Sequence, residues 1–147
     1  MAILHNPKFV LAAAAITAVL AVLSFEHPFI IGSLGSTAFT VFAMPNNITA
    51  RPRNVLGGHL TGLFCGLLLS FIPISGTIAG ALVLAPAVGL AMFLMVVFDF
   101  EHPPAAGTAM GAAMAGYSVD VMITVIAGSI VLCLLHTLLQ KRIRDLV

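Results

Sequence analysis

Charged side chains are scarce in this sequence. Only 7% of its 147 residues are Asp, Glu, Lys or Arg, whereas soluble domains carry roughly a quarter. Hydrophobic residues make up 61%, and the mean hydropathy is +1.16. Because so few polar side chains are available to coat a soluble globule, we expect the chain to be an all-α integral membrane protein whose solvent is the bilayer.

Other absences exclude whole classes of function. Trp is missing and Tyr117 is the only tyrosine, so the usual interfacial aromatic belt is not expected. Cys65 and Cys133 lie in apolar runs without CxxC spacing, which favours small buried hydrophobes. No basic stripe for nucleic acid and no HExxH, P-loop or GxSxG motif occurs. We therefore expect neither a cofactor, a metal nor an enzyme.

Pro, Gly and Asn divide the apolar sequence into six predicted helices. They are Lys8–Ser24, Phe29–Ala43, Val55–Ile72, Thr77–Phe98, Ala105–Tyr117 and Val121–Leu139. The first resembles a signal peptide, but no small-residue cleavage site follows it, so we expect a retained helix. Asn54 is the predicted N-cap of the third. Residues 1–147 are expected to form a single transmembrane domain.

The sequence contains an internal repeat. Phe25–Pro28 is identical to Phe100–Pro103, and four residues later Gly32–Ser33 is matched by Gly107–Thr108. Each quartet follows an apolar helix and precedes a short run of small residues. This pattern predicts two three-segment repeats, about 1–74 and 75–147. Because three crossings are an odd number, the second repeat would be inverted relative to the first, as in many transporters.

The positions of the basic residues favour six crossings. Lys8, the loop with Arg51 and Arg53, and the basic tail would then share the cytoplasmic side of the plasma membrane. Both termini would be cytoplasmic. The alternative is four crossings plus two re-entrant segments, because Phe29–Ala43 spans only about 22 Å as a helix and the hydrocarbon core is about 30 Å thick.

The two Glu-His-Pro interruptions are the main candidate site. A proline disfavours a helical conformation in the residue before it and is well suited to the first turn of a helix. Each interruption would therefore expose the amide groups of a short helix, which can bind an anion. Neighbouring hydroxyls would add donors, and each Glu would orient the adjacent His or carry protons. The equally weighted alternative is that each Glu–His pair only stabilises its own interruption. The candidate residues are Glu26, His27, Pro28, Gly32, Ser33, Glu101, His102, Pro103, Gly107 and Thr108.

A second candidate region is the loop and helix start at 51–59. Arg51 and Arg53 are candidates to attract an anion, although a purely topological role is the simpler interpretation. Asn54 and His59 complete this group. His59 is one turn into its predicted helix, and we expect it to face inward.

Two ridges of small residues predict close helix packing. Gly58, Gly62 and Gly66 form one ridge, and Gly107 with Gly111 begins another. Such ridges allow helix backbones to approach within lipid. We expect packing within one chain, with a homo-oligomer interface as the alternative.

Three ordered blocks resemble the HPP family of integral membrane proteins. His102-Pro103-Pro104 resembles the family signature, Pro28–Ala38 resembles its first conserved block, and Arg51–His59 resembles its second. The resemblance runs from about Phe9 to the last helix. The family is usually described with four membrane helices, and some members in chloroplasts and cyanobacteria are nitrite transporters. The resemblance therefore implies transport of nitrite or a similar small monovalent anion.

Two other functions remain as alternatives. One is an intramembrane metal-dependent enzyme that uses the Glu and His of both interruptions, since carboxylates and neutral imidazoles can ligate metals. The other is a non-catalytic membrane module that acts through a partner. Apart from lipid and the small anion, the sequence identifies no partner.

Overall fold

The computed structural model describes residues 14, 17, 18, 21, 28–140, 143 and 145. Most of the predicted helix Lys8–Ser24, the residues Glu26 and His27, and the basic side chains of the tail lie outside them. The described elements are α2 (Pro28–Ala43), the short 3-10 helix η2 (Ile48–Ala50), α3 (Pro52–Leu69), α4 (Gly76–Val97), α5 (Pro104–Ala115) and α6 (Val119–Leu139). No strand occurs among them, so the predicted all-α class is confirmed.

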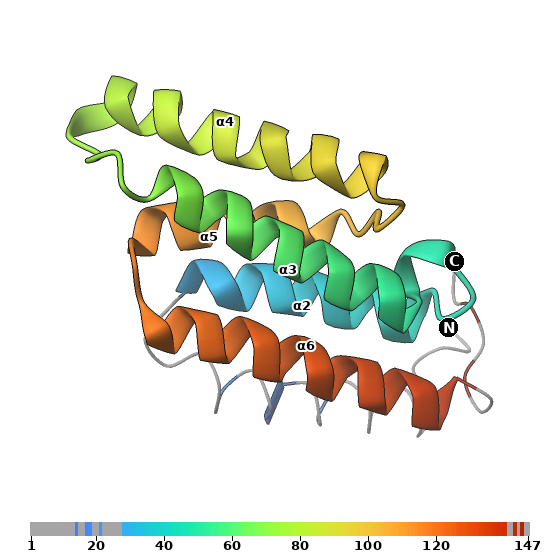
Figure 1. Ribbon diagram of the computed structural model, residues 1–147. Coiled ribbons are helices and arrows are strands. Elements are labelled where there is room, and N and C mark those ends of the chain that lie inside the picture. Colours follow the sequence, from blue (N-terminus) through green and yellow to red (C-terminus); the bar gives the residue numbers. More distant parts are fainter. Residues whose placement is uncertain are drawn as a thin grey trace.

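Successive helices run in opposite directions through one bundle (Figure 1). The α3–α4 and α5–α6 turns lie at one end, while η2 and the α4–α5 connection lie at the other. At that second end, the Asn46 side chain donates a 2.9 Å hydrogen bond to the Asp145 carboxylate. The loop before α3 and the C-terminal tail are therefore at the same end, as the six-crossing topology predicts.

Two helix starts differ from the prediction. α3 begins at Pro52 with Arg51 as its N-cap, so the prediction that Asn54 caps this helix is wrong: Asn54 lies inside the first turn. α5 begins at Pro104, and Pro103 is its N-cap. The first of two successive prolines ends the connection, and the second takes the N1 position, where its missing N–H costs nothing.

The central helix is α5, which packs against α2, α3 and α4. Small residues on both sides of these contacts allow the close packing. A Cβ added at Gly62 of α3, for example, would meet the Ala105 carbonyl of α5. A Cβ at Gly107 would lie 3.3 Å from Cβ of Ser33 on α2. Both glycine ridges are thus used inside the chain, as predicted.

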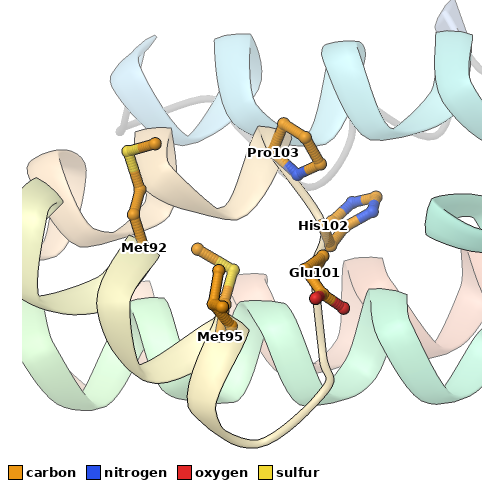
Figure 2. A pocket seen from close by; sticks show the side chains of 6 residues that line it. Met92, Met95, Glu101, His102 and Pro103 are labelled. Carbon is orange, nitrogen blue, oxygen red and sulfur yellow. The ribbon is translucent and has the colours of Figure 1, made fainter.

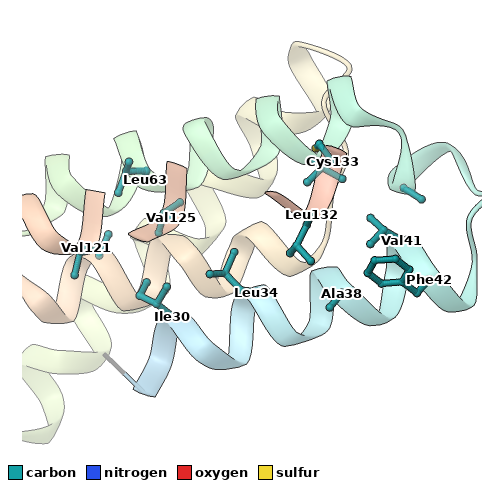
Figure 3. Packing of buried hydrophobic residues seen from close by; sticks show 13 residues of the cluster. Ile30, Leu34, Ala38, Val41, Phe42, Leu63, Val121, Val125, Leu132 and Cys133 are labelled. Atoms are coloured by element: carbon teal, nitrogen blue, oxygen red, sulfur yellow. The ribbon is translucent and has the colours of Figure 1, made fainter. Parts of the chain in front are cut away.

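The larger apolar side chains fill the space between α2 and α6. Ile30 and Leu34 of α2 are buried with Val121, Val125 and Leu132 of α6 (Figure 3). Burying one such side chain contributes roughly 1.5–3 kcal/mol. Cys65 and Cys133 are free and buried, which confirms their predicted role as small buried side chains.

The outer faces of α4 and α6 carry large apolar side chains. Both helices are long and apolar enough to cross a membrane, yet only 28% and 39% of their apolar windows are buried. Ile78 and Leu82 of α4 are 79% and 70% exposed. A core helix of a soluble protein would be mostly buried, so these faces are suited to lipid.

Candidate functional site

His102 lies in the connection between α4 and α5, and its ring is completely buried. Its Nδ1 is 2.7 Å from the carbonyl oxygen of Thr49, and its Nε2 is 2.9 Å from Oγ1 of Thr37. A carbonyl oxygen only accepts, so Nδ1 carries the hydrogen. In the neutral ring Nε2 then accepts. The Thr37 hydroxyl can donate to Nε2 or to the Ser33 carbonyl at 3.0 Å, and only donation to Nε2 leaves this ring nitrogen paired.

His59 of α3 is the second buried ring, and its centroid lies 5.2 Å from that of His102. Its Nε2 is 2.8 Å from the same Thr37 oxygen, and its Nδ1 is 2.8 Å from Oγ1 of Thr108. Since the Thr37 hydrogen points to His102, the neutral His59 ring donates from Nε2 to Thr37. Its Nδ1 therefore accepts from Thr108.

Ser33 ends this series of hydrogen bonds. Its hydroxyl oxygen lies 2.7 Å from that of Thr108 and 2.7 Å from the Pro104 carbonyl. The Ser33 hydroxyl can donate to either oxygen. When it donates to Thr108, the neutral state is a head-to-tail chain in which every donor points the same way. We call it the histidine–hydroxyl chain, and in order of donation it comprises Ser33, Thr108, His59, Thr37, His102 and the Thr49 carbonyl.

Local sequence explains how these side chains meet. Ser33 and Thr37 are one helical turn apart, so both lie on the face of α2 that is turned toward α3 and α5. A Cβ at Gly58 of α3 would lie only 2.6 Å from Cβ of His102. The absence of a side chain there lets the interruption settle against α3, with both imidazoles bonded to Thr37.

A hollow of about 400 Å³ lies between α2 and the start of α5. Ser33 lines it, so one end of the histidine–hydroxyl chain faces this hollow. Its walls are otherwise small or apolar. The lining residues are Phe29, Gly32, Ser33, Ser36, Pro103, Pro104, Gly107 and Met110. Four predicted site residues from the two repeats are brought together here.

A second hollow, of about 220 Å³, lies between α4 and the α4–α5 connection. Figure 2 shows Met92 and Met95 of α4 on one side and His102 and Pro103 on the other. Both nitrogens of His102 are already bonded to Thr37 and Thr49. This hollow therefore has no available imidazole, and Glu101 is the one acidic residue among its otherwise mostly apolar lining.

The predicted anion site at the start of α5 is not formed by free amides. Pro103 and Pro104 have no N–H group. The next two amides, of Ala105 and Ala106, donate to the carbonyls of His102 and Pro103 at 2.9 and 3.1 Å. The donors near this point are instead the hydroxyls of Ser33 and Thr108. The equivalent interruption before Pro28 lies outside the described residues.

Glu101 does not orient His102, because both ring nitrogens have other partners. The backbone of Glu101 is held instead: its carbonyl accepts a 3.2 Å hydrogen bond from the buried Asn54 side chain. Asn54 thus links the start of α3 to the interruption, a positioning role that the sequence did not reveal.

The two arginines lie away from the histidines. Arg53 forms a 2.7 Å ion pair with Asp99, and its guanidinium lies 5.2 Å from the centre of the Phe100 ring. Arg51 is exposed at the N-cap of α3. The charge of Arg53 is therefore compensated at the surface.

Sequence reasoning missed Thr37 and Thr49. Thr37 lies between the two imidazoles, and Thr49 supplies the terminal carbonyl. A signal for Thr37 was present, because Ser33 and Thr37 are spaced i, i+4 on a short, otherwise apolar helix. The role of Thr49 has no such signal, since any residue provides a carbonyl.

Hydrogen-bonded polar side chains are buried inside a helical bundle whose outer faces are apolar. This arrangement defines a helical membrane protein. The family model described as "HPP, transmembrane region" matches residues 5–145, and the chain belongs to this family.

Two proteins of Dictyostelium discoideum, each named as a transmembrane protein, are similar to this chain. One is 30% identical over 81 residues, covering 55% of this chain and 28% of the relative. The other is 29% identical over 85 residues, covering 58% and 27%. The matches thus span less than a third of these relatives, and no solved structure matches.

Proposed function

We propose that the chain transports a small monovalent anion, with nitrite as the first candidate, across a membrane. The observation that carries this proposal is the histidine–hydroxyl chain, which is buried in an apolar bundle and ends at Ser33 on the hollow between α2 and α5. Polar groups are costly within a membrane, and groups of this kind are usually functional. The family membership supports the same proposal.

The lining of the hollow suits a small anion that must bind and then leave. An anion that loses its hydration shell needs hydrogen-bond donors, and the Ser33 hydroxyl lies on the wall of the hollow. No Lys or Arg lines the hollow among the described residues. Donors without a fixed positive charge bind an anion weakly enough for release, which conduction requires.

The proposed topology has six crossings, both termini in the cytoplasm, and the plasma membrane as the location. The alternating helices support it, as does the position of the α2–α3 loop beside the tail (Figure 1). The inverted repeat is part of this proposal. Ser33 and Thr108, which occupy equivalent repeat positions, touch each other. The apolar faces of α4 and α6 remain for lipid or a second copy of the chain.

Nitrite flux into proteoliposomes tests the function. Wild-type protein is expected to raise nitrite uptake above that of protein-free liposomes, which report the leak of nitrous acid through lipid. His102→Gln retains a neutral donor and acceptor but not the imidazole, and it is expected to reduce uptake to the leak. Folded wild-type protein with no uptake above the leak would remove the proposal.

A further inference from the structure

We propose that the histidine–hydroxyl chain takes up one proton together with each anion, so that transport is electroneutral. This inference rests on the proposed function and concerns the energy coupling of the same site. It follows from the alternative carbonyl acceptors beside the hydroxyls of the chain, the position of Ser33 and the burial of both imidazoles.

The neutral histidine–hydroxyl chain has fewer N–H and O–H hydrogens than pairs of groups at hydrogen-bonding distance. Two ring N–H groups and three hydroxyls supply five hydrogens. Seven pairs lie at hydrogen-bonding distance, because the Ser33 and Pro104 carbonyls are also within 3.0 Å of a hydroxyl. Each of these two carbonyls is an alternative acceptor for a hydroxyl of the chain. The hydroxyls can therefore change partners when a proton is added, without leaving a hydrogen unpaired.

Adding one proton to Nδ1 of His59 reverses the end of the chain at the hollow. Nδ1 then donates to Thr108 across the 2.8 Å contact, and the Thr108 hydroxyl turns to donate to Ser33. The Ser33 hydroxyl is released from Thr108 and donates to the Pro104 carbonyl or to an anion in the hollow. Protonation thus converts Ser33 from a side chain that donates inward into a donor for the hollow.

Burial links the proton to the anion. An isolated positive charge is costly in an apolar interior, as is an isolated anion, whereas a pair of opposite charges is tolerated. The two imidazole centres are only 5.2 Å apart, so charging both is disfavoured by repulsion. One proton and one monovalent anion is the occupancy that leaves the site neutral.

Few other titratable groups face the two imidazoles. α2, α4, α5 and η2 contain none. α3 adds Arg53, which is paired with Asp99, and Cys65. Glu101 neighbours His102 without bonding to it, and α6 adds Asp120 in its first turn. On α6, Cys133 and His136 also contact the carbonyls of Pro52 and Pro45. Within the described part of the chain, His59 and His102 are therefore the groups best placed to hold the proton.

Proteoliposomes with a clamped membrane potential and an internal pH dye test the coupling. We expect protein-dependent nitrite entry, above the leak of protein-free liposomes, to deliver one proton per nitrite and to be insensitive to the potential. His59→Gln keeps a neutral donor toward Thr37 but cannot be protonated, so it should lose proton-coupled entry. Nitrite entry that follows the potential without proton delivery would overturn the coupling and leave the proposed function intact. Unchanged proton-coupled entry in His59→Gln would also overturn it.

A measurement on the wild-type protein avoids dependence on a variant. In lipid nanodiscs, ¹⁵N-histidine NMR near pH 6, about where an ordinary histidine titrates, distinguishes neutral from doubly protonated rings. We expect added nitrite to protonate one of the two buried rings. Saturable nitrite binding with both rings still neutral overturns the coupling alone. An absence of both nitrite binding and nitrite flux overturns the coupling and the proposed function together.

Discussion

The hydroxyl oxygens of Ser33 and Thr108 lie 2.7 Å apart, although the residues are 75 positions apart in the sequence. The same spacing separates Pro28 from Pro103. In the proposed inverted repeat, equivalent residues that touch each other would lie beside a two-fold axis, and the α3–α5 and α6–α2 contacts would be equivalent. The site would then lie where the two halves of the chain meet, as in inverted-repeat transporters.

Thr37→Val tests whether the histidine–hydroxyl chain is both structural and functional. The substitution removes the hydroxyl between His59 and His102 with little change of shape. We expect the free energy of unfolding to fall by about 1–3 kcal/mol, because buried ring nitrogens lose a partner. Nitrite flux should fall to the leak of protein-free liposomes.

Thr40→Val is the matched control on the same helix. The Thr40 hydroxyl donates only to the Ser36 carbonyl, at 3.0 Å. Flux in this variant should remain near that of the wild type. Equal losses of flux in Thr37→Val and Thr40→Val would show that transport does not depend on the hydroxyl between the two imidazoles.

Gly62→Ala tests the close packing of α3 on α5. The new Cβ would meet the backbone of Ala105 and Ala109, which cannot turn away as a side chain can. We expect thermal unfolding in detergent to report a loss of about 1–3 kcal/mol. In Gly89→Ala the new Cβ meets nothing within 4 Å. The stability of α4 should therefore be unchanged or raised by up to about 1 kcal/mol. A Gly62→Ala protein as stable as Gly89→Ala would contradict the packing.

Asp99 combines a strained backbone with an exposed ion pair. Its φ is 58°, and the amides of Asp99 and Phe100 close the C-terminus of α4 by donating to Val96 and Met95. Asp99→Gly loses the ion pair with Arg53 but relieves the left-handed backbone, so stability should change by less than about 1 kcal/mol. Asp99→Ala loses the same ion pair and keeps the left-handed strain, so it should be less stable than Asp99→Gly by about 1–2 kcal/mol.

Arg53→Gln separates the ion pair from transport. Both partners are well exposed, at 61% and 68%, so the stability loss should stay below about 1 kcal/mol. Nitrite flux should be unchanged, because Arg53 contacts neither imidazole and does not line the hollow. A large loss of flux would instead assign Arg53 to the path of the anion.

The contact between Asn46 and Asp145 tests the topology. The backbone and side-chain N–H groups of Asn46 lower the pKa of the Asp145 carboxyl. The contribution of this contact to stability is therefore present at neutral pH and is lost as the pH falls through the lowered pKa.

Cross-linking in membranes tests the topology. Cysteines placed at 46 and 145 should cross-link. Cysteines at 46 and 75 should not, because 46 lies between α2 and η2 and 75 precedes α4, and these two connections are at opposite ends of the bundle (Figure 1). The re-entrant topology keeps 46 and 75 on opposite sides but places 75 with the tail. A cross-link between 75 and 145, with none between 46 and 145, would therefore support it.

The hydrophobic segments and their interruptions could be predicted from the sequence alone. Apolar length and the positions of Pro and Gly located all five described helices to within a few residues, because these are local properties of the chain. The membrane class followed from the scarcity of charge. The small-residue ridges also indicated which helix faces would pack closely.

The partners of the polar groups were decided only by the tertiary structure. Adjacency in sequence suggested that Glu101 would bond to His102, yet His102 bonds to Thr37 and Thr49, which are 65 and 53 positions away. Buried imidazoles take the donors and acceptors that packing brings within reach, and close approach at Gly58 and Gly107 decides which these are. The sequence by itself therefore determined a helical membrane protein with two proline interruptions, and the packing of α2, α3 and α5 determined its site.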